Sequence, residues 1–384
     1  MKKKALCLAS MASNLDNFNR NNVKILQELG YRVTLATNTH STEDTNSQDK
    51  IDSFMADMEN EGVSIVHIDF SRSIGNIKKQ ISSYRQVRDL LKEGFDLIHC
   101  HSPICSVITR FCAKKYRKEG LKVIYTAHGF HFYKGAPLKN WLLFYPIEKM
   151  CSRWTDVLIT INKEDYELAK RKMHAKKVEY VPGVGVDIKK FSNVVVDRDK
   201  KREELGIPKD AKMLLSVGEL NENKNHKIVI EALGKLHDPN FHYVIAGVGD
   251  QKEKLESLAK ENNVNLHLLG YRKDISELCK CADLYVHPSL REGLPVALME
   301  AIASKTTVIC SRIRGNEELV TEDNMFSSIN SDELKDRLDA FIAEKLKKTI
   351  AHNYKTLKQF DLERVNQDIA DLYAGGVLKG IDIY

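Results

Sequence analysis

Two glutamates separated by seven residues, Glu292 and Glu300, are the side chains best suited to chemistry in this chain. They follow an apolar run over residues 282–289, which we predict to be a short buried strand that ends at a Pro-Ser break. Pro295 suits the first turn of a helix, because its missing N–H would be unpaired there in any residue. Glu292 should therefore lie in a loop and Glu300 on the helix. An ionised carboxylate only accepts hydrogen bonds, so each glutamate suits the hydroxyl groups of a sugar or ribose.

The residues between the two glutamates favour an anion-binding loop. Gly293 allows the backbone to approach a ligand, and Leu294 and Pro295 lead into the helix. The free N–H groups of a first helical turn attract phosphate. The alternative is an ordinary strand–loop–helix unit whose two glutamates face solvent.

Other candidate residues each come directly after a predicted strand. Ligands of parallel α/β sheets bind at the carboxyl ends of the strands, so such residues are expected to line one crevice. The strand over residues 122–126 precedes His128 and His131. The later strands over residues 213–217, 242–246 and 266–269 precede these candidates: Gly218, Glu219 and Lys224; Gly247 and Gly249; and Arg272.

Four ordered segments resemble the family 4 retaining glycosyltransferases, and in particular their capsular and exopolysaccharide branch. These segments are residues 9–26, 126–135, 216–226 and 292–300. The resemblance extends over essentially the whole chain. It implies the GT-B fold, in which two Rossmann-like domains face an interdomain cleft.

The resemblance also implies roles for single residues. His128 would contact the donor sugar near the reacting carbon, and Lys224 would neutralise the nucleotide diphosphate. Glu292 would bind hydroxyls of the transferred sugar and Glu300 those of the ribose, while backbone near Arg272 would flank the base. GT-B enzymes generally use no metal, so we expect no cofactor and no metal site, with a UDP-sugar as donor.

Glu219 departs from the family pattern. Many members carry Gly-Arg-Leu where this chain has Gly218-Glu219-Leu220, and their arginine grips the diphosphate. A carboxylate that pointed at phosphate would repel it. We therefore expect Glu219 to turn away or to bond another group.

Apolar β-branched runs alternate with amphipathic stretches along the whole chain, which predicts two doubly wound α/β domains. Glycines and a proline over residues 181–187 mark the boundary between them. We predict an acceptor-binding domain over residues 1–186 and a nucleotide-sugar-binding domain over residues 187–352. A C-terminal helix over residues 353–384 should cross back to the first domain, as in the GT-B fold.

The bulk composition fits a cytoplasmic protein. The chain has 384 residues, of which 42% are hydrophobic, and no run reaches the roughly 18 apolar residues of a membrane span. The apolar run after Lys4 is too short for a signal peptide. The eight cysteines match no zinc pattern and mostly fall in apolar segments, so we expect them to be reduced and buried.

Positive charge is concentrated in the first half. Residues 1–190 carry 31 Lys and Arg against 21 Asp and Glu, and the remainder carries 28 against 32. No nucleic-acid-binding module accompanies this charge, so an anionic bilayer or a lipid diphosphate is the better partner. A lysine-rich solvated surface is the alternative.

The segment over residues 132–149 mixes aromatic residues, leucines and lysines, as membrane interfaces do. We expect peripheral contact with the inner face of the membrane and a sugar on a polyprenyl diphosphate as acceptor. The residues assigned to this acceptor side are Asn14, Phe18, His131, Lys134 and Trp141. The alternative is a core helix with snorkelling lysines.

Three functions fit the sequence. The first is a retaining glycosyltransferase that acts in surface polysaccharide assembly. A UDP-sugar 2-epimerase shares the fold but turns over without an acceptor. A non-catalytic partner subunit is the third, and Glu219 is the feature that would favour it.

Overall fold

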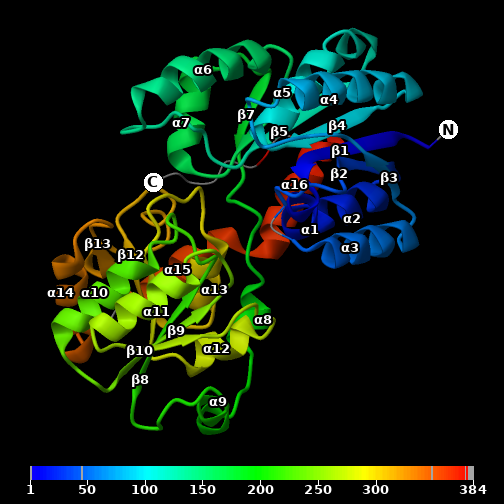
Figure 1. Cartoon of the computed structure of the whole chain (residues 1–384). Coiled ribbons are helices and arrows are strands. Elements are labelled where there is room, and N and C mark those ends of the chain that lie inside the picture. Colours follow the sequence, from blue (N-terminus) through cyan, green and yellow to red (C-terminus); the bar gives the residue numbers. More distant parts are fainter. Residues whose placement is uncertain (1, 45, 347–348, 377, 379–384) are drawn as a thin grey trace. The chain divides into compact units, whose positions relative to one another are not determined.

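The computed structural model describes residues 2–44, 46–346, 349–376 and 378, and its chain divides into two compact units (Figure 1). The first unit comprises Met1–Gly183 and Val365–Tyr384, and the second comprises Val184–Arg364. The expected divisions at residues 186/187 and 352/353 differ from these. The second expected division falls inside a helix that packs within the second unit.

The first unit is built on a seven-stranded sheet in which every strand pair is parallel. The strand order is β3-β2-β1-β4-β5-β6-β7. The strands are β1 Lys4–Met11, β2 Arg32–Asn38, β3 Ser64–His67, β4 Leu97–His101, β5 Lys122–Ala127, β6 Val157–Thr160 and β7 Lys177–Tyr180. The helices are α1 Ala12–Phe18, α2 Arg20–Glu28, α3 Gln48–Asn60, α4 Ile77–Leu90, α5 Pro103–Ala113, α6 Leu138–Ser152 and α7 Lys163–Lys172, with 3-10 turns at Leu91–Glu93 and Tyr116–Glu119.

Helices cover both faces of this sheet (Figure 1). Side chains alternate along a strand, so neighbouring residues enter opposite layers. Leu6 and Leu8 of β1 belong to the core formed with α4 and α5. Ala5, Cys7 and Ala9 belong to the core formed with α1, α2 and α3. The first unit is therefore doubly wound, as the sequence predicts.

The second unit has a six-stranded parallel sheet of order β10-β9-β8-β11-β12-β13. Its strands are β8 Lys212–Val217, β9 Phe241–Ala246, β10 Asn265–Leu268, β11 Leu284–His287, β12 Thr307–Ser311 and β13 Met325–Phe326. Its helices are α8 Ile188–Ser192, α9 Arg198–Glu204, α10 His226–Leu236, α11 Lys252–Glu261, α12 Ile275–Cys281, α13 Val296–Ala303, α14 Ser331–Ile342 and α15 Thr349–Leu357, with 3-10 turns at Glu322–Asn324 and Lys358–Phe360.

The strands that we predict over residues 122–126, 213–217, 242–246, 266–269 and 282–289 are all present as β5, β8, β9, β10 and β11, and their ends differ from the prediction by at most two residues. The sequence missed β13, which is only two residues long. Each of the eight cysteines is buried with a free thiol. None of the helices in the described part of the chain is long and apolar enough to cross a membrane.

The C-terminal tail, which we predict to be one helix from residue 353 onwards, is instead broken into two helices. The chain leaves helix α15 and enters α16, Leu362–Ala374, through an extended residue, Asp361. The N–H of Val186 donates to Phe360 O at 2.9 Å, and the N–H of Leu362 donates to Val186 O at 3.0 Å. This short parallel bridge uses backbone groups that a continuous helix would need, so the helix stops and restarts.

Helix α16 returns the chain to the first unit. Val365, Ile369, Leu372 and Tyr373 lie in the same core cluster as the inner residues of β1. The ammonium group of Lys122 donates to the carbonyl of Leu372 at 2.6 Å. The crossing-back segment therefore begins at α16, whose first residue, Leu362, lies nine residues after the predicted start at residue 353.

A buried ion pair attaches α6 to the rest of the first unit. Arg110 on α5 is fully buried, and its Nη2 lies 3.0 and 2.9 Å from the two carboxylate oxygens of Glu148 on α6. The guanidinium also lies over the ring of Tyr125, 4.1 Å from its centroid. The inner side of α6 is thereby held by charge as well as by packing.

We expect Arg110→Leu to lower the unfolding free energy of the first unit by about 3–5 kcal/mol, because Glu148 would remain buried without its partner. Both tryptophans, Trp141 and Trp154, lie in this unit, so urea unfolding followed by tryptophan fluorescence reports on it alone. Adding Glu148→Leu should restore at least half of the loss.

The matched control for this prediction is Arg88→Leu, since the side chain of Arg88 is 48% exposed. Its effect should stay within about 0.5 kcal/mol. A double variant no more stable than Arg110→Leu would show that the ion pair is not the reason for the loss.

Candidate functional site

In the second unit, Lys224 and Glu292 form an ion pair although 68 residues separate them in the chain. Lys224 lies in the loop after β8, and its Nζ donates to Glu292 Oε1 at 2.7 Å. The same carboxylate oxygen lies 3.2 Å from Nε2 of His287, the last residue of β11. The ends of two neighbouring strands thus bring a cation, a carboxylate and an imidazole together.

Charge at this cluster is set by burial and by the partners. Burial of the Glu292 side chain opposes its ionisation, but the hydrogen bond from His287 and the charge of Lys224 outweigh it and hold the pKa of Glu292 below its usual range. Burial also lowers the pKa of His287, whose side chain is only 2% exposed. At neutral pH the cluster therefore contains an ionised carboxylate and an uncharged imidazole that donates to it.

The loop that carries Lys224 is fixed to the loop that carries Glu292. The N–H of Leu290 donates to Asn223 O at 2.8 Å, and Asn223 Nδ2 donates to Arg291 O at 3.1 Å. Asn225 Nδ2 donates to the carbonyl of Pro288 at 3.2 Å. These hydrogen bonds of the two residues that flank Lys224 fix the backbone position from which its side chain extends.

Two glycines, Gly247 and Gly249, are required by the packing of the loops on each other. A Cβ on Gly247 would lie 1.8 Å from the carbonyl oxygen of Gly218, and a Cβ on Gly249 would lie 2.3 Å from that of Leu220. A Cβ on Gly218 would lie 3.2 Å from Cδ of Lys224. The sequence related Gly247 and Gly249 to a ligand, whereas the close approach seen here is between backbone segments.

Residues 293–295 lead from Glu292 into helix α13. Leu294 is buried, and a neighbouring loop packs so closely on Gly293 that a Cβ on Gly315 would lie 2.4 Å from the Gly293 carbonyl oxygen. Pro295 is the residue just before the helix, one position earlier than predicted, and its side chain offers no cap to the first N–H groups. The first turn of α13 therefore follows directly on the Glu292 loop.

Glu300 lies on α13 in a different electrostatic environment. Burial raises the pKa of its carboxyl group to about 7, and the charge of Lys190 on α8 opposes this rise in part. The two glutamates thus differ at neutral pH, because Glu292 is ionised whereas Glu300 is partly protonated.

Glu219 and Arg272 are each bound to a neighbour. Glu219 is exposed, and its Oε2 accepts a hydrogen bond from Asn221 Nδ2 at 2.9 Å. It therefore bonds another group, one of the two arrangements that we expected. Arg272 pairs through Nε and Nη2 with the carboxylate of Asp274, at 2.8 and 2.5 Å. Its guanidinium is committed to this local pair.

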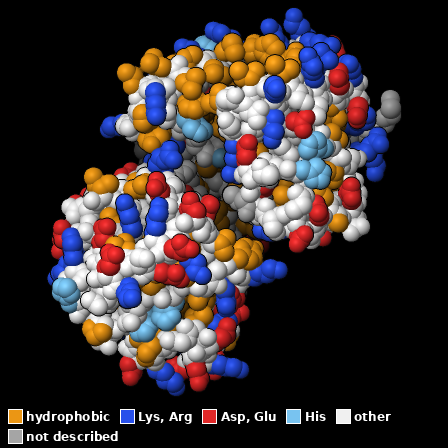
Figure 2. Space-filling model, in the orientation of Figure 1, with side chains coloured by type: hydrophobic (Ala, Val, Ile, Leu, Met, Phe, Trp, Pro, Cys, Tyr) orange, Lys and Arg blue, Asp and Glu red, His pale blue; other side chains and the backbone are white. Residues whose placement is uncertain are grey.

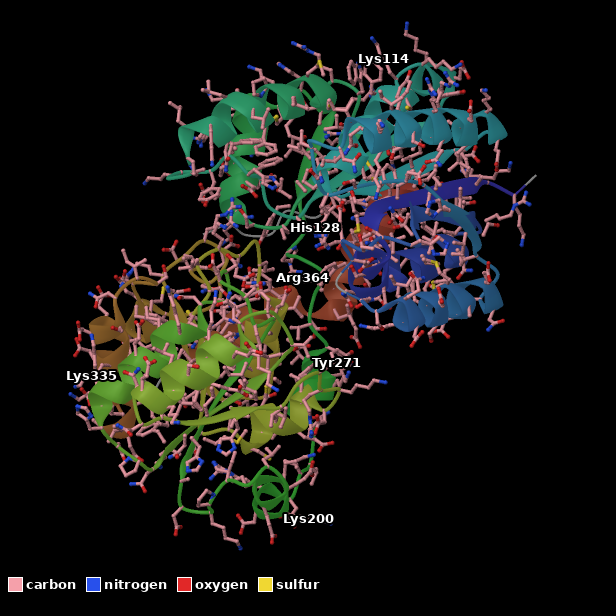
Figure 3. All side chains as sticks on the ribbon, in the orientation of Figure 1. Lys114, His128, Lys200, Tyr271, Lys335 and Arg364 are labelled. Atoms are coloured by element: carbon pink, nitrogen blue, oxygen red, sulfur yellow. The ribbon has the colours of Figure 1, made fainter. Side chains whose placement is uncertain are left out.

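In the first unit, His128 follows β5 and precedes Gly129, whose φ of 117° suits glycine (Figure 3). The ring of Phe18 on α1 lies 5.8 Å from the His128 ring. Asn14 on the same helix donates from Nδ2 to Ser102 Oγ, just after β4, at 2.9 Å. The structure therefore brings Asn14, Phe18 and His128 to the ends of adjacent strands.

The other predicted acceptor-side residues gather at α6. The ring of His131 stacks on Phe144, with centroids 4.6 Å apart. Trp141 Nε1 donates to Tyr133 O at 3.3 Å, and the backbone N–H of Lys134 donates to Glu164 Oε1 at 2.8 Å. These residues form a set around α6.

Sequence reasoning missed several residues that complete the two sites. It treated His287 only as part of the loop before Glu292, and it did not consider Asn223, His99 or His101. His287 and His101 are the last residues of β11 and β4, so their position at strand ends was the available signal. Within the described residues, no group of three or more His, Cys, Asp and Glu side chains is arranged to hold a metal ion.

Comparison with known proteins assigns both units. The family model described as "Glycosyltransferase Family 4" matches residues 17–190, and that described as "Glycosyl transferases group 1" matches residues 197–357. The chain is 36% identical over 308 residues to a Bacillus subtilis protein named as the glycosyltransferase EpsD, covering 77% of this chain and 81% of that protein.

One further sequence relative and one solved structure are similar to this chain over most of its length. The chain is 28% identical over 322 residues to the Escherichia coli enzyme named UDP-Gal:alpha-D-GlcNAc-diphosphoundecaprenol alpha-1,3-galactosyltransferase, covering 80% of this chain and 81% of that enzyme. The crystal structure of Anabaena HepE in complex with UDP and glucose superposes with a TM-score of 0.75 at 18% identity, over 97% of this chain and 100% of that one.

We expect Glu300→Gln to stabilise the second unit above pH 7. A carboxyl group whose folded pKa is raised contributes stability below its unfolded pKa of about 4.3, and this contribution is lost as the pH rises through about 7. The gain on substitution should reach roughly 3–4 kcal/mol at pH 8.5 and fall to about 1 kcal/mol at pH 5, because the penalty for ionising Glu300 grows between its unfolded and its folded pKa. Scanning calorimetry at both pH values measures it, with Glu253→Gln on exposed α11 as the control. A gain that does not depend on pH would contradict the assignment.

Proposed function

This chain belongs to the family 4 glycosyltransferases and has the GT-B fold, and we propose that it transfers a sugar from a UDP-sugar to a lipid-linked acceptor in surface polysaccharide assembly. The E. coli relative is named for UDP-galactose as donor and for a GlcNAc-diphosphoundecaprenol acceptor, and HepE was crystallised with UDP. Those names support the donor and acceptor classes for this chain.

The ion pair between Lys224 and Glu292 carries the proposal. A nucleotide diphosphate needs a cation, because negative charge grows on the phosphates as the leaving group departs. In the proposed reaction Lys224 exchanges the Glu292 carboxylate for the diphosphate. The released carboxylate, held ionised by His287, then accepts hydrogen bonds from hydroxyls of the transferred sugar.

The remaining donor contacts follow from the same loops. The first turn of α13 directs N–H groups towards the phosphates, and the carboxylate of Glu300 accepts hydrogen bonds from the ribose hydroxyls. The family resemblance implies a contact of His128 with the donor sugar. The protein's share of catalysis is positioning and electrostatics, with the departing phosphate deprotonating the acceptor hydroxyl. Lys224 and these N–H groups serve the diphosphate in this proposal, without a metal cofactor.

Glu219 does not weaken this proposal. Its carboxylate is exposed and accepts a hydrogen bond from Asn221. Solvent therefore screens the negative charge of Glu219. The non-catalytic alternative had Glu219 as its main support.

Calorimetric titration with UDP, GDP, ADP and CMP tests the donor site. We expect selective UDP binding, which Lys224→Ala weakens roughly 10- to 100-fold because a charge-assisted hydrogen bond is lost. Lys227→Ala, an exposed lysine at the start of α10, is the control. Hydroxyl donors favour the ionised form of Glu300, so UDP binding near pH 7 should also release protons, seen as a buffer-dependent enthalpy. Absence of nucleotide binding would reject the proposed donor, and acceptor-free conversion of a UDP-sugar would indicate the epimerase.

The acceptor side of the proposal rests on the outer surface of α6, here called the α6 face. Leu138 and Leu142 are 73% and 71% exposed, and the face is completed by three further exposed residues: Leu143, Ile147 and Met150. Trp141, which the sequence assigns to the acceptor side, and Phe144 pack partly against the core.

Positive charge surrounds the α6 face. Figure 2 shows hydrophobic side chains gathered on this side of the first unit with lysines and arginines around them. Exposed Lys139 lies on α6 itself, and Lys114 and Lys115 follow α5, which packs against α6. An apolar strip bordered by cations suits the headgroup region of an anionic bilayer. We propose that this face holds the enzyme at the cytoplasmic side of the membrane, where a polyprenyl-diphosphate acceptor resides.

Vesicle co-sedimentation tests membrane contact. We expect wild-type protein to bind vesicles that contain an anionic phospholipid, and the double variant Leu138→Asp with Leu142→Asp to lose at least tenfold in partitioning, because it removes apolar area and adds repulsion. Ile329→Asp with Ile342→Asp, two exposed positions of the second unit, adds the same charge elsewhere. Equal binding by both double variants would exclude the α6 face as the contact.

A further inference from the structure

A row of three histidines extends from the interior of the first unit to its candidate site residue. His99 and His101 are alternate residues of β4, so they lie on the same side of the sheet, with ring centroids 4.1 Å apart. His101 Nδ1 lies 3.1 Å from Nε2 of His128. His99 and His101 are 0% and 2% exposed, and three imidazoles in contact are more than packing of a core requires.

The inner end of the row is fully bonded. His99 Nδ1 lies 2.6 Å from the hydroxyl of Tyr373 on α16, and its Nε2 lies 2.8 Å from Thr126 Oγ1. Burial lowers the pKa of His99 to about 3, and burial together with the neighbouring imidazoles His99 and His128 lowers that of His101 well below its usual range. Both buried imidazoles are therefore neutral at physiological pH.

The outer end of the row is asymmetric. Nε2 of His101 is buried and has no hydrogen-bond partner among the described residues. Neutral imidazole carries its proton on one nitrogen and a lone pair on the other. A proton on Nε2 of His101 would leave a buried N–H donor unpaired, which native proteins rarely tolerate. A proton on Nδ1 leaves only an unpaired acceptor.

We infer that His101 is a positioning residue that holds His128 in one tautomer. With its proton on Nδ1, His101 donates to Nε2 of His128, so neutral His128 must carry its own proton on Nδ1. His128 then presents an N–H donor on the side away from His101. It can donate to a hydroxyl or phosphate oxygen of a ligand, and it lacks the outward lone pair that a general base needs.

The nitrogen spectrum of the histidine rings tests the tautomer directly. Ring ¹⁵N shifts of labelled protein at pH 7 distinguish the Nδ1–H, Nε2–H and doubly protonated forms, and the signals of His128 are identified by their loss in His128→Asn. We expect the Nδ1–H form. A His128 signal in the Nε2–H form, or in the doubly protonated form, would overturn the inference. This measurement needs only the wild-type protein and one assignment variant.

Removal of the donor tests the cause. In His101→Leu we expect the His128 signals to move towards a mixture of tautomers. Tyr373→Phe is the matched control, because it removes a hydrogen bond from the same row at His99 and leaves the His101–His128 bond intact. That variant should lower the unfolding temperature without shifting the His128 signals. Equal shifts in both variants would mean general loosening of the core.

The kinetic part rests on the proposed function. In His101→Leu we expect kcat to fall roughly five- to tenfold, the loss of about one well-oriented neutral hydrogen bond, with KM for the UDP-sugar changed less than threefold. Tyr373→Phe should keep wild-type kcat. An altered tautomer with unchanged kcat would overturn the positioning role, whereas absence of transferase activity in the wild type would refute the proposed function and leave the spectrum to decide the tautomer.

Discussion

Parallel pairing of the strands is the constraint on which both units depend. Each strand pair of the two sheets runs parallel, so within each sheet all carboxyl ends lie at one edge. The loops after β8, β9 and β11 must share this edge. Those after β8 and β9 contact each other at Gly218 and Gly247, and the loop after β11 bonds to the loop after β8 through Leu290 N–H and Asn223 O. The crowding fixes the loop that carries Lys224, and this in turn places an ammonium group against Glu292. Strand direction therefore determines which loops meet at the site, and the single side chains act within that arrangement.

Local pattern was enough to predict much of the fold. Apolar runs of four to eight residues give strands, and the residues that follow each run lie at the functional edge, which is why Lys224, Glu292 and His128 were identified. Sequence could not show that Lys224 and Glu292 bind each other, because nothing local relates residues 68 positions apart. It also could not show that His287 donates to the same carboxylate. Those pairings follow from the order of strands in the sheet.

The wrong or displaced predictions have physical causes of the same kind. The periodicity of the tail gave one helix, but a backbone bridge to Val186 interrupts it at Asp361. The aromatic residues of α6 looked interfacial, but Trp141 and Phe144 pack partly against the core, on the side of the helix that carries Glu148. The leucines thereby become its outer surface. In each case a distant partner decided between alternatives that the local sequence left open.

The Lys224–Glu292 pair has a consequence for the direction of turnover. In the proposed reaction, a complete donor would compensate both members of the broken pair, since its diphosphate would bind the lysine and its sugar hydroxyls would bind the glutamate. The nucleotide left after transfer has phosphates but no sugar, so Glu292 would stay buried and unpaired while it remains bound. The re-formed pair at 2.7 Å therefore competes with the spent nucleotide more strongly than with the donor. An internal ion pair of this kind limits product inhibition without any moving lid.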